Sequence, residues 1–160
     1  MIVVSDTSPI LNLARIGRLE LLPGLYQQVL VPSRVHGELR DSLGSVSLDL
    51  DSLDWLVVAS PEDRARVEAL SAELDPGEAE AIVLALERRA DLLLVDERRG
   101  RHTATMAGLR VTGLIGVLTA AKGAGLIDAV KPVLDALIRD ARFWIGRALY
   151  REVLTHLGEL

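Results

Sequence analysis

The sequence predicts an α/β domain with a central, mostly parallel sheet covered by helices on both faces. The main observation is that short, uninterrupted apolar runs alternate with longer segments whose apolar residues recur every three or four positions. Short, continuous apolar runs are typical of strands buried on both faces, and apolar residues that recur every three or four positions are typical of helices. Strands that alternate with helices pair in parallel through right-handed crossovers, which predicts a three-layer, Rossmann-like architecture.

Length and composition limit the possible functions. The 160 residues, 49% of them hydrophobic, are enough for one domain spanning residues 1–160. The chain has no cysteine and only three histidines, none in an H-x-x-x-H pair, so a metal would need oxygen ligands. A net charge of −5 argues against non-specific nucleic-acid binding by bulk charge, and the two Trp, two Tyr and one Phe offer no obvious base-stacking platform.

The chain begins with no basic and apolar leader, and it has no apolar run near the ~20 residues of a membrane span. We therefore expect a cytoplasmic protein with no membrane partner.

The first half of the chain opens with a buried strand that ends on an acid, Asp6. Ser8 followed by Pro9 has the chemistry of a helix N-cap and first turn, and Gly17 is a stop signal. A short apolar piece closed by Pro23-Gly24 follows. The pattern then predicts a buried strand at 29–32, a helix from Ser33, a loop at 41–54 and an edge strand at 55–59.

The second half repeats the opening design. Helix-start signals at 60–62 and at Asp75-Pro76 precede a buried strand at 92–95, and this strand again ends on an acid, Asp96. A helix at 97–107, a short strand at 109–112 and a helix at 113–122 follow. We expect residues 128–160 to form a helical extension, interrupted near Pro132 and at 139–142, that packs on the domain.

The final helix carries an apolar stripe at successive steps of four residues: Ile145, Leu149, Val153 and Leu157. Such a stripe is normally buried. We expect it to pack on the domain's own sheet, with a homodimer as the alternative.

Four acids are the candidate functional residues, namely Asp6, Glu38, Glu78 and Asp96. Two lie at the ends of strands and two in helices that can reach the same rim of a parallel sheet, where ligands gather. Each also has a structural interpretation. Asp6 and Asp96 can be helix caps, Glu38 can pair with Arg34 four residues earlier, and Glu78 can complete a capping box with Asp75.

The coincidence of acids at both strand ends favours a functional interpretation. Carboxylates brought close together repel and raise one another's pKa, and such an arrangement normally persists where a divalent cation neutralises it. The sequence therefore predicts a Mg²⁺ or Mn²⁺ site. Glu80 is an alternative to Glu78, although it lies two residues further along the helix and faces elsewhere.

An ordered set of motifs resembles the PIN-domain ribonucleases, the fold of VapC-like toxins. The set consists of D-T-S-P after the first strand, the helix of Glu38, G-E-A-E-A-I at 77–82 with L-A-L after it, and L-L-L-V-D-E-R-R-G-R at 92–101. The resemblance extends from Asp6 to about Gly125. It is closest to the PIN branch with a G-E-A-E-A-I helix and a V-D-x-R-x-G-R strand exit.

The resemblance implies that Asp6, Glu38, Glu78 and Asp96 form the catalytic, metal-binding quartet, with Thr7 or Ser8 as the small hydroxyl beside the first acid. Toxins of this kind often have Asp where this chain has Glu78. A Mg²⁺- or Mn²⁺-dependent hydrolysis of RNA phosphodiester bonds is the implied reaction. A small antitoxin is the implied partner, docking at 41–54 or on the final helix, and an antitoxin arginine could reach the quartet.

A basic cluster follows Asp96 directly and consists of Arg98, Arg99, Arg101 and His102. With Ser8, these arginines are the candidate RNA-binding residues, because guanidinium groups hold phosphates well. The alternative is a solvated helix face.

Three other functions were weighed against a nuclease. A dinucleotide site is excluded because Gly123-Ala-Gly125 follows a helix and Asp128 stands where the third glycine belongs. A phosphatase of the aspartyl type needs a second Asp two residues after Asp6, where the chain has Ser8. The remaining rival is a PIN-fold binding or regulatory protein with weak or no nuclease activity.

Overall fold

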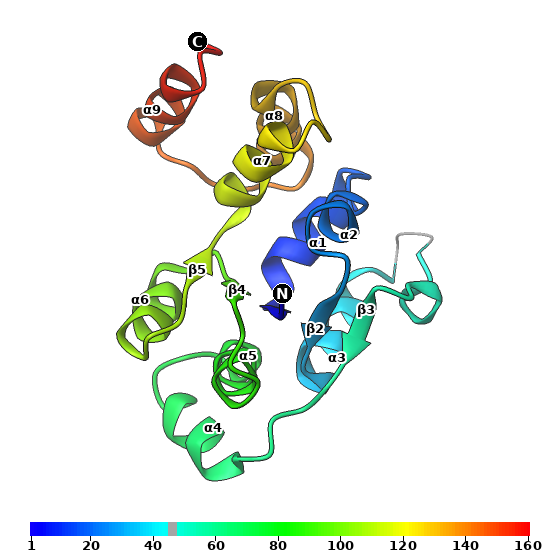
Figure 1. Cartoon of the computed structure of the whole chain (residues 1–160), viewed down its shortest axis with the longest axis vertical. Helices are drawn as coiled ribbons and strands as arrows, with labels where there is room; N and C mark the ends of the chain where they lie inside the picture. The colour runs from blue at the N-terminus through cyan, green and yellow to red at the C-terminus, as the bar shows by residue number, and fades with distance from the viewer. Residues whose placement is uncertain (45–47) are drawn as a thin grey trace.

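The computed structural model describes residues 1–44 and 48–160, and these residues form a five-stranded, all-parallel sheet in the order β3-β2-β1-β4-β5. Figure 1 shows helices on both sides of this sheet, so the predicted α/β architecture is confirmed. The strands are β1 (Val3–Ser5), β2 (Val29–Val31), β3 (Leu56–Val58), β4 (Leu92–Leu94) and β5 (Val111–Thr112).

The helices alternate with the strands, as the apolar spacing predicts. They are α1 (Thr7–Arg15), α2 (Leu21–Tyr26), α3 (Ser33–Ser42), the 3₁₀ turn η1 (Leu50–Ser52), α4 (Arg64–Leu70), α5 (Pro76–Glu87), α6 (Arg98–Met106), α7 (Leu114–Gly123), α8 (Val130–Asp140) and α9 (Arg147–His156).

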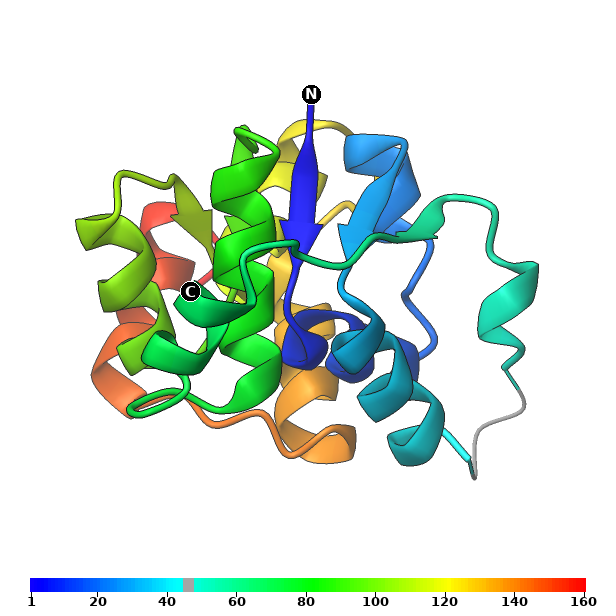
Figure 2. The same ribbon diagram turned by 90° about the horizontal axis from the view of Figure 1, so that it is seen from below.

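The two faces of the sheet bury two different sets of side chains, because successive residues of a strand point to opposite sides. In β1, Val3 packs with α1, α2, α3, α7 and α8, whereas Val4 packs with α5 and α6 on the opposite face. Figure 2 shows the same layers from below. Both faces of the central strands are thus buried, which explains why their sequences are continuous apolar runs.

The start of α1 differs from the prediction. The helix begins at Thr7, so Ser8 and Pro9 lie inside its first turn and Asp6 occupies the N-cap position. The Asp6 side chain nevertheless makes no capping hydrogen bond to the helix. The conclusion that Asp6 is free of a capping role therefore stands, although the assignment of Ser8 as N-cap is wrong. At the other end, Gly17 takes a positive φ of 69° and ends the helix as predicted.

The region predicted as a loop at 41–54 is partly helical. Helix α3 continues to Ser42, and Leu50 is buried within the short turn η1. Residues 45–47 of this predicted loop lie outside the residues that the structure describes. The edge position of β3 agrees with the prediction.

The C-terminal helices pack differently from the expectation for the apolar stripe. Pro132 lies in the first turn of α8 and does not interrupt the helix. Helix α9 is fastened to α7 and α8 by polar contacts, in which Lys122 donates to the Leu157 carbonyl oxygen and Tyr150 donates to Asp135. Leu149 of the stripe is 46% exposed, whereas Ile145 and Leu157 are partly buried against the main core, so the expected burial of the stripe is only partial.

In the part of the chain that the structure describes, no helix is long and apolar enough to cross a membrane.

Candidate metal centre

The centre of the candidate site is the C-terminal edge of β1 and β4. These strands are neighbours in the sheet, with Ser5 opposite Leu94, and the Asp6 N–H donates to the Leu94 carbonyl oxygen at 2.9 Å. Asp6 and Asp96 therefore follow adjacent strand ends at one edge, as the sequence predicts. This edge is where α/β sheets place their ligands.

Asp6 is a buried carboxylate, only 4% exposed. Burial raises its pKa from 3.8 to about 7, the Thr7 backbone N–H opposes this rise, and the nearby acids Glu78, Asp75 and Glu38 increase it. Three acids from other elements thus lie close enough to affect its charge. At neutral pH, Asp6 is poised to lose its proton when a cation approaches.

Glu38 is held in place by residues of two other elements. The Thr7 hydroxyl donates to Glu38 Oε2 at 2.5 Å, which ties the start of α1 to α3. On its other side, the Glu38 carboxylate lies against Gly77 in the first turn of α5, where a Cβ would come within 2.9 Å of both carboxylate oxygens. Of the two hydroxyls that the sequence offers beside Asp6, that of Thr7 is the one that contacts Glu38.

Glu78 is buried at the start of α5, and its Oε2 has no hydrogen-bond partner within the described residues. Burial raises the pKa of Glu78 to about 7, and the charges of Asp75 and Glu97 raise it further. The same oxygen is in such close contact with Gly100 that a Cβ there would collide with it. The glycine of the R-R-G-R motif, Gly100, thus makes room for the Glu78 carboxylate.

Asp96 lies beside the start of α7. Its Oδ1 accepts the Leu114 backbone N–H at 2.8 Å, whereas its buried Oδ2 has no partner among the described residues. Burial raises the pKa of Asp96, against the opposing effects of the Leu114 N–H and the Arg101 charge. Asp96 therefore caps α7 and not the helix that follows it in the chain, and one of its oxygens stays available.

The four predicted acids are not equally close. The charges of Glu78 and Glu38 raise the pKa of Asp6, whereas the side-chain charge that acts on the pKa of Asp96 is that of Arg101. Within residues 1–44 and 48–160, no three acids or histidines lie close enough together to hold one metal ion. Asp6, Glu38 and Glu78 thus lie near enough for their charges to interact, but the three are not close enough to ligate one ion in this arrangement. Asp96 follows the neighbouring strand at the same edge.

The chemistry of these groups suits a hard divalent cation. All four candidate donors are carboxylates, the ligands that Mg²⁺ and Mn²⁺ prefer. Two of their buried oxygens lack a hydrogen-bond partner among the residues that the structure describes, which is costly unless another group compensates them. The pKa values of Asp6 and Glu78 near 7 express the same unsatisfied negative charge.

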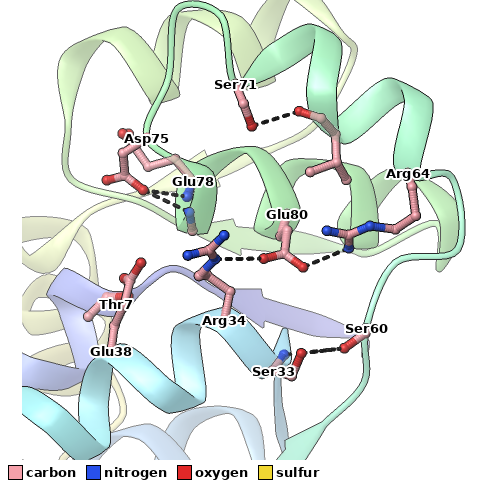
Figure 3. Close-up of polar contacts among 12 residues, drawn as sticks. Thr7, Ser33, Arg34, Glu38, Ser60, Arg64, Ser71, Asp75, Glu78 and Glu80 are labelled. Carbon is pink, nitrogen blue, oxygen red and sulfur yellow. Dashed lines mark hydrogen bonds and ion pairs between the residues drawn. The ribbon is translucent and has the colours of Figure 1, made fainter.

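Glu80 is committed to a different interaction. Its buried carboxylate pairs with Arg64 at 2.8 Å and with Arg34 at 3.5 Å. In Figure 3, Arg34 extends from α3 toward Glu80 on α5, and Arg64 approaches Glu80 from the opposite side. Arg34 is thus paired with Glu80 rather than with Glu38 four residues along its own helix. These contacts leave Glu78, and not Glu80, with an unpartnered oxygen.

Sequence reasoning missed two acids that influence the site, Asp75 and Glu97. Asp75 caps α5 by accepting the backbone N–H groups of Gly77 and Glu78, as the capping-box pattern indicates. Its charge also acts on Asp6 and Glu78. The one-turn spacing between Asp75 and Glu78 was a signal that could have revealed this proximity.

The candidate RNA-binding residues are separated by the structure. Arg98 and Arg101 line a hollow of about 380 Å³ together with Asp96. Arg99 points elsewhere, because its guanidinium donates to the Glu73 carbonyl oxygen at 3.1 Å. Ser8 is half-buried within α1.

The fold and the site define an α/β protein with a parallel sheet and carboxylates at the ends of two adjacent strands. A family model described as a PIN domain matches residues 2–159. The chain therefore belongs to the PIN-domain family, whose members are generally nucleases that use divalent metals. No curated protein matches the chain.

Proposed function

We propose that this protein is a Mg²⁺- or Mn²⁺-dependent ribonuclease that hydrolyses RNA phosphodiester bonds. The observation that carries the proposal is the set of four acids near one sheet edge, of which Asp6 and Glu78 are buried. Glu78 and Asp96 each have a buried oxygen without a hydrogen-bond partner among the described residues. Membership of the PIN-domain family supports it. In this proposal, Asp6, Glu38, Glu78 and Asp96 hold the metal.

A bound divalent cation supplies Lewis-acid activation of water and neutralises charge on the phosphate. The chain's own residues prepare the site for this chemistry. Thr7 fixes the orientation of Glu38 by its hydrogen bond, and the Leu114 N–H fixes Asp96 with one oxygen turned away. Arg101, whose positive charge reaches Asp96, is placed to bind a phosphate beside the acids.

The decisive experiment measures cleavage of single-stranded RNA in Mg²⁺ or Mn²⁺. Wild-type protein should cleave slowly, whereas EDTA, Asp6→Asn and Asp96→Asn should each abolish cleavage. Glu68→Gln is the matched control, because Glu68 is an exposed acid on α4. Activity that persists in EDTA and in both Asn variants would indicate a contaminating nuclease. A folded protein that binds RNA without cleaving it would favour a regulatory PIN-fold protein.

The biological role that we propose is the toxin of a toxin–antitoxin pair, by analogy with VapC-like members of the family. A small antitoxin would restrain the nuclease, and an antitoxin arginine would pair well with the clustered carboxylates. Expression of the protein alone should arrest bacterial growth, and Asp6→Ala should relieve the arrest. Equal growth of both strains at matched soluble expression would remove the toxin role and leave the nuclease proposal intact.

A further inference from the structure

The hollow next to Asp96 combines two kinds of chemistry. One wall carries the charged side chains of Arg98 and Arg101 from α6, and the other carries Phe143 and Trp144 from the connection between α8 and α9. Its volume of about 380 Å³ is within the range of small-ligand sites, which is about 300–1,000 Å³. The segments that form it are more than 40 residues apart in the sequence, so sequence analysis found no aromatic platform.

Trp144 is the most exposed large hydrophobic residue of the described chain, at 84%. The backbone on either side of it is fixed. The Phe143 N–H donates to the Leu137 carbonyl oxygen at 3.0 Å, and Gly146 forms the N-cap of α9. Phe143 itself is half-buried against the main core. The hydrogen bond of Phe143 and the start of α9 thus hold the indole in solvent. Exposure to solvent is unfavourable for a large apolar ring that has no partner.

Among the described residues, neither Arg98 nor Arg101 forms an ion pair or a side-chain hydrogen bond, although the charge of Arg101 acts on Asp96. Asp96, which lines the same hollow, has the buried and unpartnered Oδ2. An occupant of this hollow must therefore offer an anionic group to the arginines and a flat apolar face to the indole.

We propose that the hollow binds one nucleotide of a single-stranded RNA, with its base stacked on Trp144 and its phosphate held by Arg98 and Arg101. This inference rests on the proposed ribonuclease function and adds a substrate site to it. Base stacking on aromatic side chains, combined with cationic groups that follow the backbone, is the general mode of single-strand binding. A nucleotide seated here would bring a neighbouring phosphate to Asp96, because Asp96 lines the same hollow.

A second copy of the chain is the main alternative occupant. An adjoining apolar groove between α7 and α9, lined by Ile115, Leu149 and Val153, is continuous with the hollow through Ile115 and Leu149. The two arginines and the acid at the other end of the hollow argue against a self-interface, because charged residues are depleted at interface cores. Charge complementarity therefore favours RNA.

The test uses Trp144 as its own probe. The sequence has two tryptophans, so Trp55→Phe makes Trp144 the sole one. Asp6→Asn is added to prevent cleavage, since Asp6 does not line the hollow. Titration with a uridine oligomer in Mg²⁺ should quench the Trp144 fluorescence to saturation. An abasic oligomer with the same phosphates should bind more weakly and leave the fluorescence unchanged.

Kinetics with cleavable RNA provide the second measurement. Trp144→Ala should raise KM about tenfold, because the loss of one stacked base is expected to weaken binding by that order. The value of kcat should change less than twofold, and Trp144→Phe should recover part of the loss. Met106→Ala, a change at a 75% exposed apolar residue of α6, is the matched control and should alter neither constant.

The outcomes separate this inference from the ribonuclease proposal. Cleavage by the wild type with an unchanged KM in Trp144→Ala, or equal quenching by the abasic oligomer, would overturn the base site and leave the nuclease standing. If Trp144→Ala instead changed only the oligomeric state in sedimentation, the surface would be an interface between copies. Absence of both cleavage and RNA binding in the wild type would overturn both proposals.

Discussion

Replacing Asp6 by Asn should stabilise the metal-free protein at pH 8, although it removes a candidate catalytic group. The pKa of Asp6 is raised from 3.8 to about 7, mainly by burial. Between these pH values the folded protein holds a proton that the unfolded chain has released. The free energy of unfolding therefore falls as pH rises, and the decrease attributable to this carboxyl reaches about 4 kcal/mol above pH 7.

The substitution removes that penalty because Asn carries no charge. At pH 8, Asp6→Asn should exceed the wild type in free energy of unfolding by about 2–4 kcal/mol, the lower value allowing for charge shared with Glu78 and Glu38. For a chain of this size, that difference raises Tm by roughly 4–16 °C. At pH 4, where Asp6 is protonated in the folded state, the two proteins should be nearly equal in stability.

Urea denaturation in EDTA at pH 4, 5, 6, 7 and 8 measures both effects. Glu68→Gln on the surface of α4 is the control and should follow the wild type at every pH. Mg²⁺ or Mn²⁺ should raise the wild-type Tm at pH 8 more than that of Asp6→Asn, since a ligand stabilises the state that binds it. A wild-type stability that is flat or rising between pH 4 and 8, with Asp6→Asn less stable at pH 8, would refute the reasoning.

Three further predictions concern residues around the site and at the C-terminus. Gly100→Ala should lower the free energy of unfolding, measured by urea denaturation, by about 1–3 kcal/mol, because its Cβ collides with the Glu78 carboxylate. Gly37→Ala, which has open space around the new Cβ, should not lower it. An equal decrease in the two variants would contradict the collision. Glu80→Ala should lower the free energy of unfolding by about 1–2 kcal/mol, which is less than the loss of a fully buried ion pair would cost, because the arginine partners of Glu80 are half exposed. An unchanged free energy of unfolding would show that these ion pairs do not stabilise the packing of α5 against Arg34 and Arg64. Glu159→Gln removes a carboxylate that accepts hydrogen bonds from the first two backbone N–H groups of α8 and from the Lys122 ammonium group. Amide exchange in α9 should then accelerate about tenfold while the strands stay unchanged, and an unchanged rate would contradict this attachment.

The sequence alone was sufficient for the architecture and for the identity of the candidate acids. Strands buried on both faces need continuous apolar residues, so runs such as 92–95 were visible without a structure. Parallel strands also end at one edge, which is why Asp6 and Asp96 could be placed together before their contacts were known. The D-T-S-P and G-E-A-E-A-I motifs pointed to the family that the matching model confirms.

Only the tertiary structure decided what surrounds those acids. The spacing of Glu78 and Glu80 in α5 left either one as a candidate, and the choice depended on Arg34 and Arg64, which reach Glu80 from two other elements. The order of Thr7 and Ser8 likewise could not show which hydroxyl meets Glu38. Such contacts depend on how helices pack, and helix packing is not encoded in local periodicity.

The C-terminal segment shows most clearly that a local sequence pattern does not specify which surfaces pack together. Its apolar stripe predicted burial, but a stripe specifies only that a face is apolar and not which surface covers it. Polar contacts such as Lys122 with Glu159 hold α9 beside α7, and the anchored connection before it leaves Trp144 exposed near Arg101. Residues this far apart in sequence become neighbours only through the fold, because long-range packing sets their positions.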